Sequence, residues 1–112
     1  MAKRDWVFTG HDINILADTI TSGILNASIS ASLEDSSYFS SGGISCIVLV
    51  FERYSVIGSN RLSLTVTLFS EPGRVRVSGI SSGGSEGILW KINTLGEEAF
   101  LDVLVGVLSS IS

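Results

Sequence analysis

The chain has 112 residues, of which 45% are hydrophobic and 16% are charged, and its formal net charge is −4. This apolar composition excludes an intrinsically disordered chain, and the length fits a single domain spanning residues 1–112. The net negative charge argues against a nonspecific nucleic-acid-binding protein, which needs a dominant basic surface.

The first two predicted elements are a short strand and a helix. Trp6 and Phe8, with a valine between them, favour a strand over residues 5–9. Apolar residues then recur at helical spacing over residues 13–24, and Asp12 stands directly before them as a suitable N-cap. The spacing therefore predicts a helix over 13–24.

The next predicted elements are a strand, a loop and a second strand. Apolar residues alternate with polar ones over 27–33, which predicts a strand with one apolar face. Residues 35–43 are rich in serine and glycine and are predicted to connect a hairpin. Residues 44–51 (ISCIVLVF) carry apolar residues on both faces, which predicts a central strand covered on each side.

A second hairpin follows a turn at residues 55–60. Residues 61–68 alternate between polar and apolar, and in residues 74–80 Val75 and Val77 are predicted to point inward. Glu71-Pro72-Gly73 lies between the two strands and fits a type II turn. Residues 81–87 are predicted as a loop, and 88–92 as a short extra strand.

The final predicted element is a helix. Thr94 and Glu97 have the spacing of a capping box, and apolar residues follow at helical spacing as far as Ile111. Leu101 and Val105 widen this apolar stripe beyond a single core face. We therefore predict that the helix contacts more than its own sheet, and that Leu101 and Val105 contribute to self-association.

Together these elements predict an α+β fold, an antiparallel sheet of five or six strands with two helices on one face. The order is strand, helix, four strands, an optional short strand and a final helix. This order resembles TBP-like and helix-grip folds, a likeness that carries no function by itself.

The lone cysteine and the N-terminal residues bear on localisation. Cys46 has no partner for an intramolecular disulfide, which suits a reducing compartment. Lys3 and Arg4 are not followed by the apolar segment of a secretory signal, and no apolar run reaches the ~18 residues that span a bilayer. We expect a cytoplasmic protein without membrane contact.

The sequence contains no recognisable catalytic or metal-binding motif. His11 is the only histidine, and Cys46 lies in the most apolar predicted strand, where we interpret it as a small buried residue. These two residues and scattered carboxylates lack metal-ligand spacing. Glu97 and Glu98 suit the N-terminal turns of a helix, where the macrodipole favours negative charge. We expect no enzyme, no catalytic residue, no metal and no cofactor.

Two sets of residues are candidates for binding. The outer face of the sheet is predicted to be hydroxyl-rich, and it is either simply solvated or a docking surface for an anionic ligand or partner, formed by Arg53, Tyr54, Arg61, Arg74 and Arg76. Four aromatic residues either fill the core or line a cavity between the final helix and the sheet: Trp6, Phe51, Trp90 and Phe100.

Several segments resemble a family of small, uncharacterised Gram-positive bacterial proteins known as a domain of unknown function. They are ASISASLED (27–35), FERYS (51–55), GSNRLSLTVTL (58–68), SGGSEG (82–87) and KINTLGEEAFLD (91–102). The resemblance implies a stand-alone bacterial cytoplasmic domain and transfers no catalytic residue.

The sequence thus favours a non-enzymatic interaction or ligand-binding domain that forms a homodimer. The alternative is a carrier of a small apolar or amphipathic ligand, held in a cavity between the helices and the sheet. No nucleic-acid partner is expected.

Overall fold

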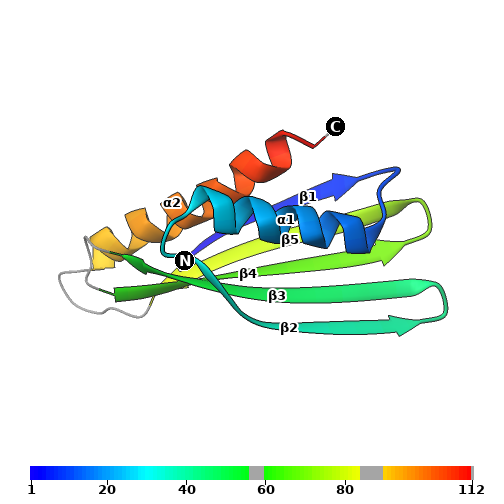
Figure 1. Ribbon diagram of the computed structural model, residues 1–112, viewed down its shortest axis with the longest axis horizontal. Helices are drawn as coiled ribbons and strands as arrows, with labels where there is room; N and C mark the ends of the chain where they lie inside the picture. Colours follow the sequence, from blue (N-terminus) through cyan, green and yellow to red (C-terminus); the bar gives the residue numbers. More distant parts are fainter. Residues whose placement is uncertain (56–59, 84–89, 112) are drawn as a thin grey trace.

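The computed structural model describes residues 1–55, 60–83 and 90–111, and contains five strands and two helices (Figure 1). Their order is β1 (Ala2–Phe8), α1 (Ile13–Ala27), β2 (Ser32–Ser41), β3 (Ile44–Ser55), β4 (Asn60–Glu71), β5 (Arg74–Gly83) and α2 (Trp90–Ser109). This order confirms the predicted one without the optional extra strand. Residues 90–92 of that predicted strand begin α2, and 88–89 lie outside the described residues.

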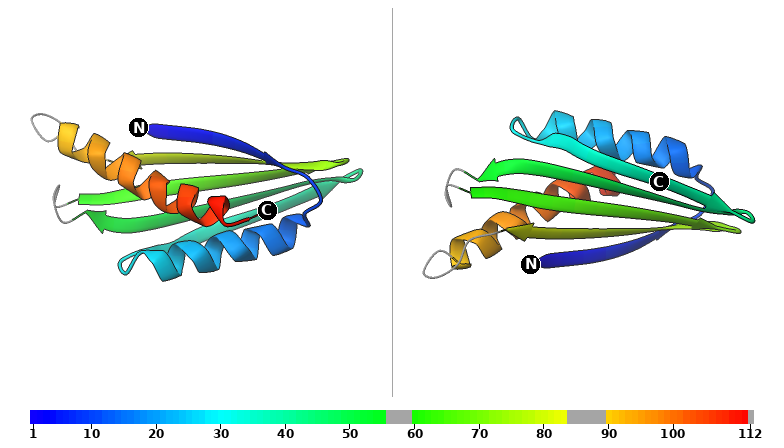
Figure 2. Two further views of the ribbon diagram at one scale, coloured as in Figure 1. Left: turned by 90° about the horizontal axis from the view of Figure 1, so that it is seen from above. Right: turned by 90° about the horizontal axis from the view of Figure 1, so that it is seen from below.

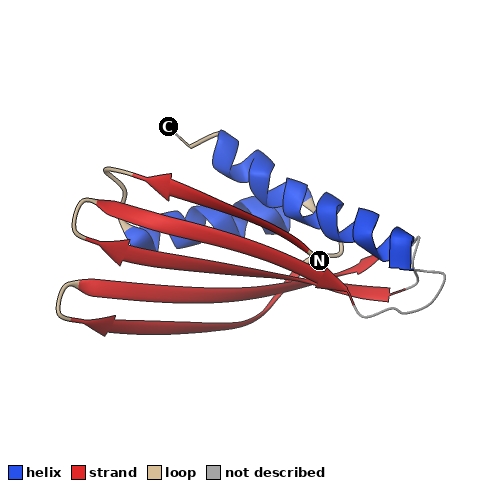
Figure 3. Cartoon of the chain, turned by 180° about the vertical axis from the view of Figure 1, so that it is seen from behind, coloured by secondary structure: helices blue, strands red, loops and turns tan. Residues whose placement is uncertain are grey.

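The five strands form one antiparallel sheet in the order β1-β5-β4-β3-β2. Both helices lie on the same face of this sheet, as predicted (Figure 2). Viewed from the opposite side, the strands lie in front of α1 (Figure 3). We call the face beneath the helices the covered face and the opposite one the open face. The likeness to TBP-like and helix-grip folds stays a prediction.

The hydrophobic core lies between the helices and the covered face. In β4 every second residue is almost completely buried: Leu62, Leu64, Val66 and Leu68. Ile20 and Ile24 of α1 and Phe100 and Leu104 of α2 are fully buried against this face. The two-residue period of the strands and the helical period of α1 and α2 thus meet in one core, as their patterns predict.

Two glycines allow the close packing of α2. A Cβ atom added to Gly79 of β5 would lie 2.5 Å from a methyl carbon of Leu104. A Cβ atom added to Gly23 of α1 would lie 2.7 Å from both γ carbons of Val107. These distances are too short for real Cβ contacts, so both positions require glycine unless their neighbours move.

The predictions for residues 27–43 are wrong. Helix α1 continues to Ala27, and Ser28 is its C-cap. Residues 29–30 form a turn, in which Ile29 is 106% exposed, and only 32–33 of the predicted strand belong to β2. The predicted loop is strand β2 instead. Its hairpin turn contains only Gly42 and Gly43, with φ of 57° and 83°. Positive φ at both central residues is typical of a two-residue hairpin turn, which explains the glycines.

The prediction for β3 is half correct. Ile47, Leu49 and Phe51 are buried on the covered face. Val48 and Val50 point to the open face, where they are half-buried among their sheet neighbours and no described helix lies over them. The strand is therefore apolar on both faces but covered on only one.

Turn and cap predictions have a mixed outcome. Asp12 is the N-cap of α1 and accepts a hydrogen bond from the Ile15 amide at 3.0 Å, and Gly73 has a φ of 86°, as a type II turn requires. The capping box is wrong, because α2 begins at Trp90 and Thr94 lies inside it. Glu97 is thus beyond the first turn, and the macrodipole does not explain it.

Candidate functional site

The open face of the sheet is the candidate functional site, because apolar side chains cross it and no helix of the described residues covers them. One row of cross-strand neighbours passes through all five strands: Phe39, Cys46, Phe69, Arg76 and Val7. Phe39 is 64% exposed, Val7 58% and Phe69 37%. Four of the five side chains in the row are apolar or weakly polar, so the row forms a nearly continuous apolar band.

The next two rows mix apolar residues with hydroxyls. Val48, Thr67 and Ser78 form one row, which ends at Asp5, and Val50, Thr65 and Ile80 form the other, which ends at Asp35 and Lys3. Cross-strand neighbours on one face lie about 5 Å apart, so the methyl groups of these threonines and valines are in contact range. The predicted hydroxyls are present, but the face is more apolar than predicted.

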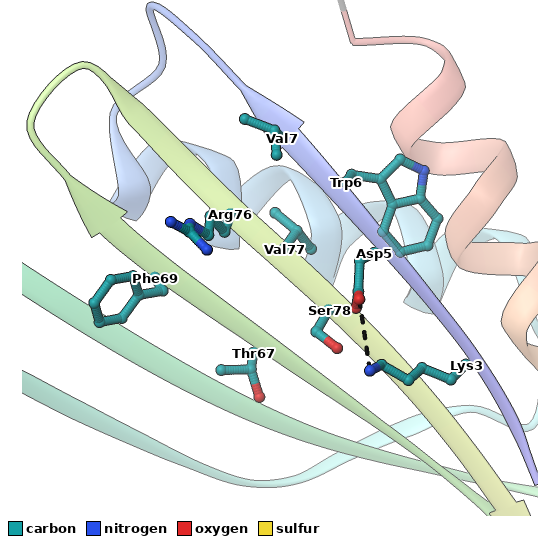
Figure 4. Close-up of a pocket in the computed structure, with 9 residues that line it drawn as sticks. All are labelled: Lys3, Asp5, Trp6, Val7, Thr67, Phe69, Arg76, Val77 and Ser78. Carbon is teal, nitrogen blue, oxygen red and sulfur yellow. Dashed lines mark ion pairs between the residues drawn. The ribbon is translucent and has the colours of Figure 1, made fainter.

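Two shallow hollows indent the open face. One, of about 370 Å³, is bordered by Val7, Phe69 and Arg76 and by an ion pair between Lys3 and Asp5 at 3.6 Å (Figure 4). Figure 4 also shows Trp6 turned away from this face, toward α2. The second hollow, of about 310 Å³, lies at the β2–β3 hairpin. Hollows of this size accept side chains of a partner.

Charged side chains gather at the two ends of the open face. At one end Glu71 accepts hydrogen bonds from the Nε atoms of Arg76 at 2.6 Å and Arg74 at 2.8 Å. These hydrogen bonds hold the pKa of Glu71 below its ordinary value, and the one from Arg76 contributes more than the one from Arg74. Both arginines are therefore engaged by the same carboxylate.

At the other end Arg61 donates from Nε to Glu52 at 2.9 Å and lies 3.9 Å from Glu34. Arg61 and Glu71 both belong to β4 and are about 33 Å apart along it, because a strand rises ~3.3 Å per residue. Tyr54 is the cross-strand neighbour of Arg61. The two charged ends are therefore separate places on the sheet.

Arg53 lies on the covered face, because it is two residues after the buried Phe51 in β3 and side chains alternate between the two faces along a strand. Its guanidinium lies 4.6 Å from the centre of the Phe100 ring and donates a hydrogen bond to Ser28 Oγ at 3.3 Å. Burial lowers the pKa of the Arg53 guanidinium below its ordinary value. The predicted arginine surface is thus divided among three places, and the structure does not bring its residues together.

The aromatic residues predicted to line a cavity lie in different environments. Phe51 and Phe100 are fully buried members of the core. Trp6 is half-buried, and its ring packs beside Gly79 under α2. The side chain of Trp90 lies outside the described part of the structure. The packing of Phe51 and Phe100 favours a core role for them, and a ligand carrier stays a prediction.

Leu101 and Val105, predicted to mediate self-association, differ in exposure. Leu101 is 7% exposed and packs over Gly79, so it belongs to the core rather than to the surface of α2. Val105 is half-buried. The wide apolar stripe of α2 therefore has an internal explanation, which is that α2 contacts both the sheet and α1.

Two polar side chains are buried on the covered side of the sheet. Glu97 is buried and accepts a hydrogen bond from the N-terminal ammonium of Met1 at 2.8 Å. Ser81 Oγ on the covered face of β5 is buried and has no hydrogen-bond partner within the described residues. The contact between Glu97 and Met1 was not predicted, because it joins positions far apart in the sequence.

The two residues considered for nucleophilic chemistry lie on opposite sides of the sheet. Cys46 is half-buried on the open face, not enclosed in the core as predicted. The ring of His11 packs edge-on against Phe8, at 5.7 Å between centroids, and Phe8 lies on the covered face. Among the described residues no three His, Cys, Asp or Glu side chains are grouped so that they could hold a metal ion.

No helix in the described ranges is both long and apolar enough to cross a membrane. Fold and surface together define a two-layer α+β domain with one uncovered sheet face. By sequence the chain belongs to DUF6054, a family of unknown function, which it matches over residues 1–112. This match confirms the resemblance to a family of unknown function along the whole chain. No curated protein matches the sequence.

Proposed function

We propose that the protein is a non-enzymatic interaction domain that self-associates, with the open sheet faces of two copies packed together. The observation that carries this proposal is the apolar band from Phe39 through Phe69 to Val7, which crosses the whole uncovered face. Exposed apolar side chains grouped on one face, with polar residues around them, mark interaction sites.

The size of the face suits a stable homodimer. Five strands spaced ~4.8 Å apart, with about ten residues each, give a face of roughly 800 Å² per copy. A pair of such faces matches the ~1,600 Å² of total surface that a standard protein interface buries. The two hollows of the face would receive the protruding side chains of the partner.

Sedimentation velocity at micromolar concentration tests the proposal. We expect a dimer for the wild type and a monomer for Phe69→Lys, because a charge in the centre of the band would be buried without a partner. Ile15→Lys is the matched control, since Ile15 is also an exposed apolar residue (67%) but lies on α1. It should leave the dimer intact, and circular dichroism should show both variants folded.

Two results would overturn the proposal. One is a wild type that stays monomeric up to hundreds of micromolar. The other is a dimer that Val105→Lys disrupts and Phe69→Lys does not, which would place the interface on α2. We also infer a cytoplasmic setting in a bacterium, which the lone, half-buried Cys46 and the family resemblance support.

A further inference from the structure

Strand β2 presents a free edge. It is the last strand of the sheet, and among the described residues it pairs only with β3. Its first half carries two features that discourage further pairing, the charged Glu34 and an irregular register between Leu33 and Asp35. Its second half, residues 36–41, contains serines and two aromatic residues, with no charge, proline or register shift. This half is open to another strand.

A groove of about 530 Å³ runs between this edge and α1. Its apolar floor is formed by Ala17, Ile47 and Leu49. Serine occupies position 36, on the covered side of β2, where a larger side chain would fill the space. The groove is rimmed by polar residues and a single exposed leucine: Asn14, Asp18, Thr21, Leu33, Ser36, Ser37 and Tyr38.

The flank formed by α1 and β2 is acidic. Neither element contains a lysine or arginine. Asp18 and Asp35 form no ion pair within the described part of the chain, and Glu34 lies 3.9 Å from the exposed Arg61. Asp18 stands on the α1 wall of the groove, and Asp35 points to the open face beside Val50. A partner on this edge therefore meets negative charge from both sides.

We propose that the free edge at residues 36–41 binds an extended segment of another protein in which apolar residues alternate with lysine or arginine. The segment adds a sixth strand, and its backbone pairs with β2. Its apolar side chains enter the part of the groove beside Ser36, and its basic side chains turn to the open face near Asp35. Strand addition supplies affinity through the backbone, and the pockets for alternate side chains supply specificity.

The negative charge of this edge argues against two other partners, a second copy of the chain and a nucleic acid. A second copy paired edge to edge would bring two acidic flanks together, each with Asp18 and Asp35, and like charges across an interface are unfavourable. A nucleic acid would meet the same repulsion. The inference does not depend on the proposed dimer, because the segment pairs with the outer edge of β2 and fills the groove beside α1.

Isothermal titration calorimetry with synthetic nine-residue peptides tests this inference on the full chain. We expect a peptide of alternating lysine and valine to bind at least tenfold more tightly than one of alternating glutamate and valine. A peptide of the same composition with all lysines first should bind at least fivefold more weakly than the alternating one. N-methylation of alternate amides should abolish binding if the backbone pairs with β2.

Variants locate the site. Asp35→Lys and Asp18→Lys should each weaken binding of the lysine peptide at least threefold, and Asp5→Lys on the opposite edge is the matched control that should not. Successive amides of an edge strand point alternately inward and outward. The amide of either Ser37 or Tyr38 therefore points away from β3, toward the added strand. Proline at that position, Ser37→Pro or Tyr38→Pro, should keep the thermal stability of the wild type and still abolish peptide binding.

The inference is overturned if the alternating lysine peptide does not bind, or if the peptide with all lysines first binds equally well. It is also overturned if Asp5→Lys weakens binding as much as Asp35→Lys. Sedimentation of the same samples separates it from the proposed function. Phe69→Lys should abolish the dimer and leave peptide binding unchanged, whereas Asp18→Lys, on the α1 wall of the groove, should weaken peptide binding and leave the dimer unchanged.

Discussion

Both faces of the sheet carry apolar side chains, but the faces differ in what covers them. In β4, Leu64, Val66 and Leu68 are fully buried under the helices, whereas Thr65 and Thr67 are half-buried and Phe69 remains partly exposed on the other side. On the covered face apolar side chains stabilise the monomer. On the open face they are available to a partner. The comparison teaches that an apolar face and a covered face are separate properties.

Adjacent residues of β4 provide the largest test of this difference. Leu68→Ala should lower the free energy of unfolding by about 2–5 kcal/mol, because it leaves a cavity in the core. Phe69→Ala should lower it by less than about 1 kcal/mol in the monomer, because this ring has no covering layer. Urea denaturation at submicromolar concentration, where a dimer would dissociate, measures both. Equal losses would show that the open face is packed as tightly as the covered one.

The helices show the same difference between a contact side and a solvent side. Gly23→Ala should destabilise the protein by about 1–2 kcal/mol, because overpacking against Val107 outweighs the gain in helix propensity. Gly106→Ala is the matched control, since a Cβ atom there would meet nothing within 4 Å. It should stabilise the protein by up to about 1 kcal/mol. Thermal and urea unfolding measure both changes.

A double mutant separates the clash from any other effect of Gly23→Ala. In a Val107→Ala background the γ carbons are absent, so Gly23→Ala should become neutral or stabilising. The coupling energy between the two positions should lie between about 0.5 and 3 kcal/mol. A Gly23→Ala variant that is equally harmful in both backgrounds would contradict close packing of α1 on α2.

Local patterns were sufficient to predict the parts of the fold that form through local rules. The hairpin of β4 and β5 could be predicted because strict alternation meets a Pro-Gly turn, and α1 because Asp12 precedes a helical stripe. Strand β2 could not, because its ten residues are held by backbone pairing with β3 and a Gly42-Gly43 turn rather than by an apolar face. Tertiary contacts such as that between Glu97 and Met1 have no local pattern at all.

The candidate site was predicted only in part, although the alternation of side chains between the two faces of each strand could have predicted more of it. Arg53 has the parity of Phe51 and so belongs under the helices, whereas Tyr54 and Arg61 belong to the open face. Phe39 and Phe69 were missed, yet Phe69 has the parity of Thr65 and Thr67 and could have been assigned to the open face. Phe39 could not, because residues 35–43 resemble a loop in sequence.

The smallest expected effect concerns the charged end of the open face, where Glu71 holds Arg74 and Arg76. We expect NMR titration to show the pKa of Glu71 below its ordinary value, and Arg76→Ala to raise this pKa more than Arg74→Ala, because the hydrogen bond from Arg76 is the larger cause.

A folded-state pKa of Glu71 below the unfolded one means that its ionised carboxylate stabilises the fold above the unfolded pKa of a glutamate. This contribution is lost as the pH falls through the folded pKa. Because the carboxylate is solvated, the change in stability should be small and should weaken with added salt. If Arg74→Ala has the larger effect on the pKa, or neither substitution changes it, Glu71 does not bridge the two arginines in solution, and the charged end of the open face is not organised as described.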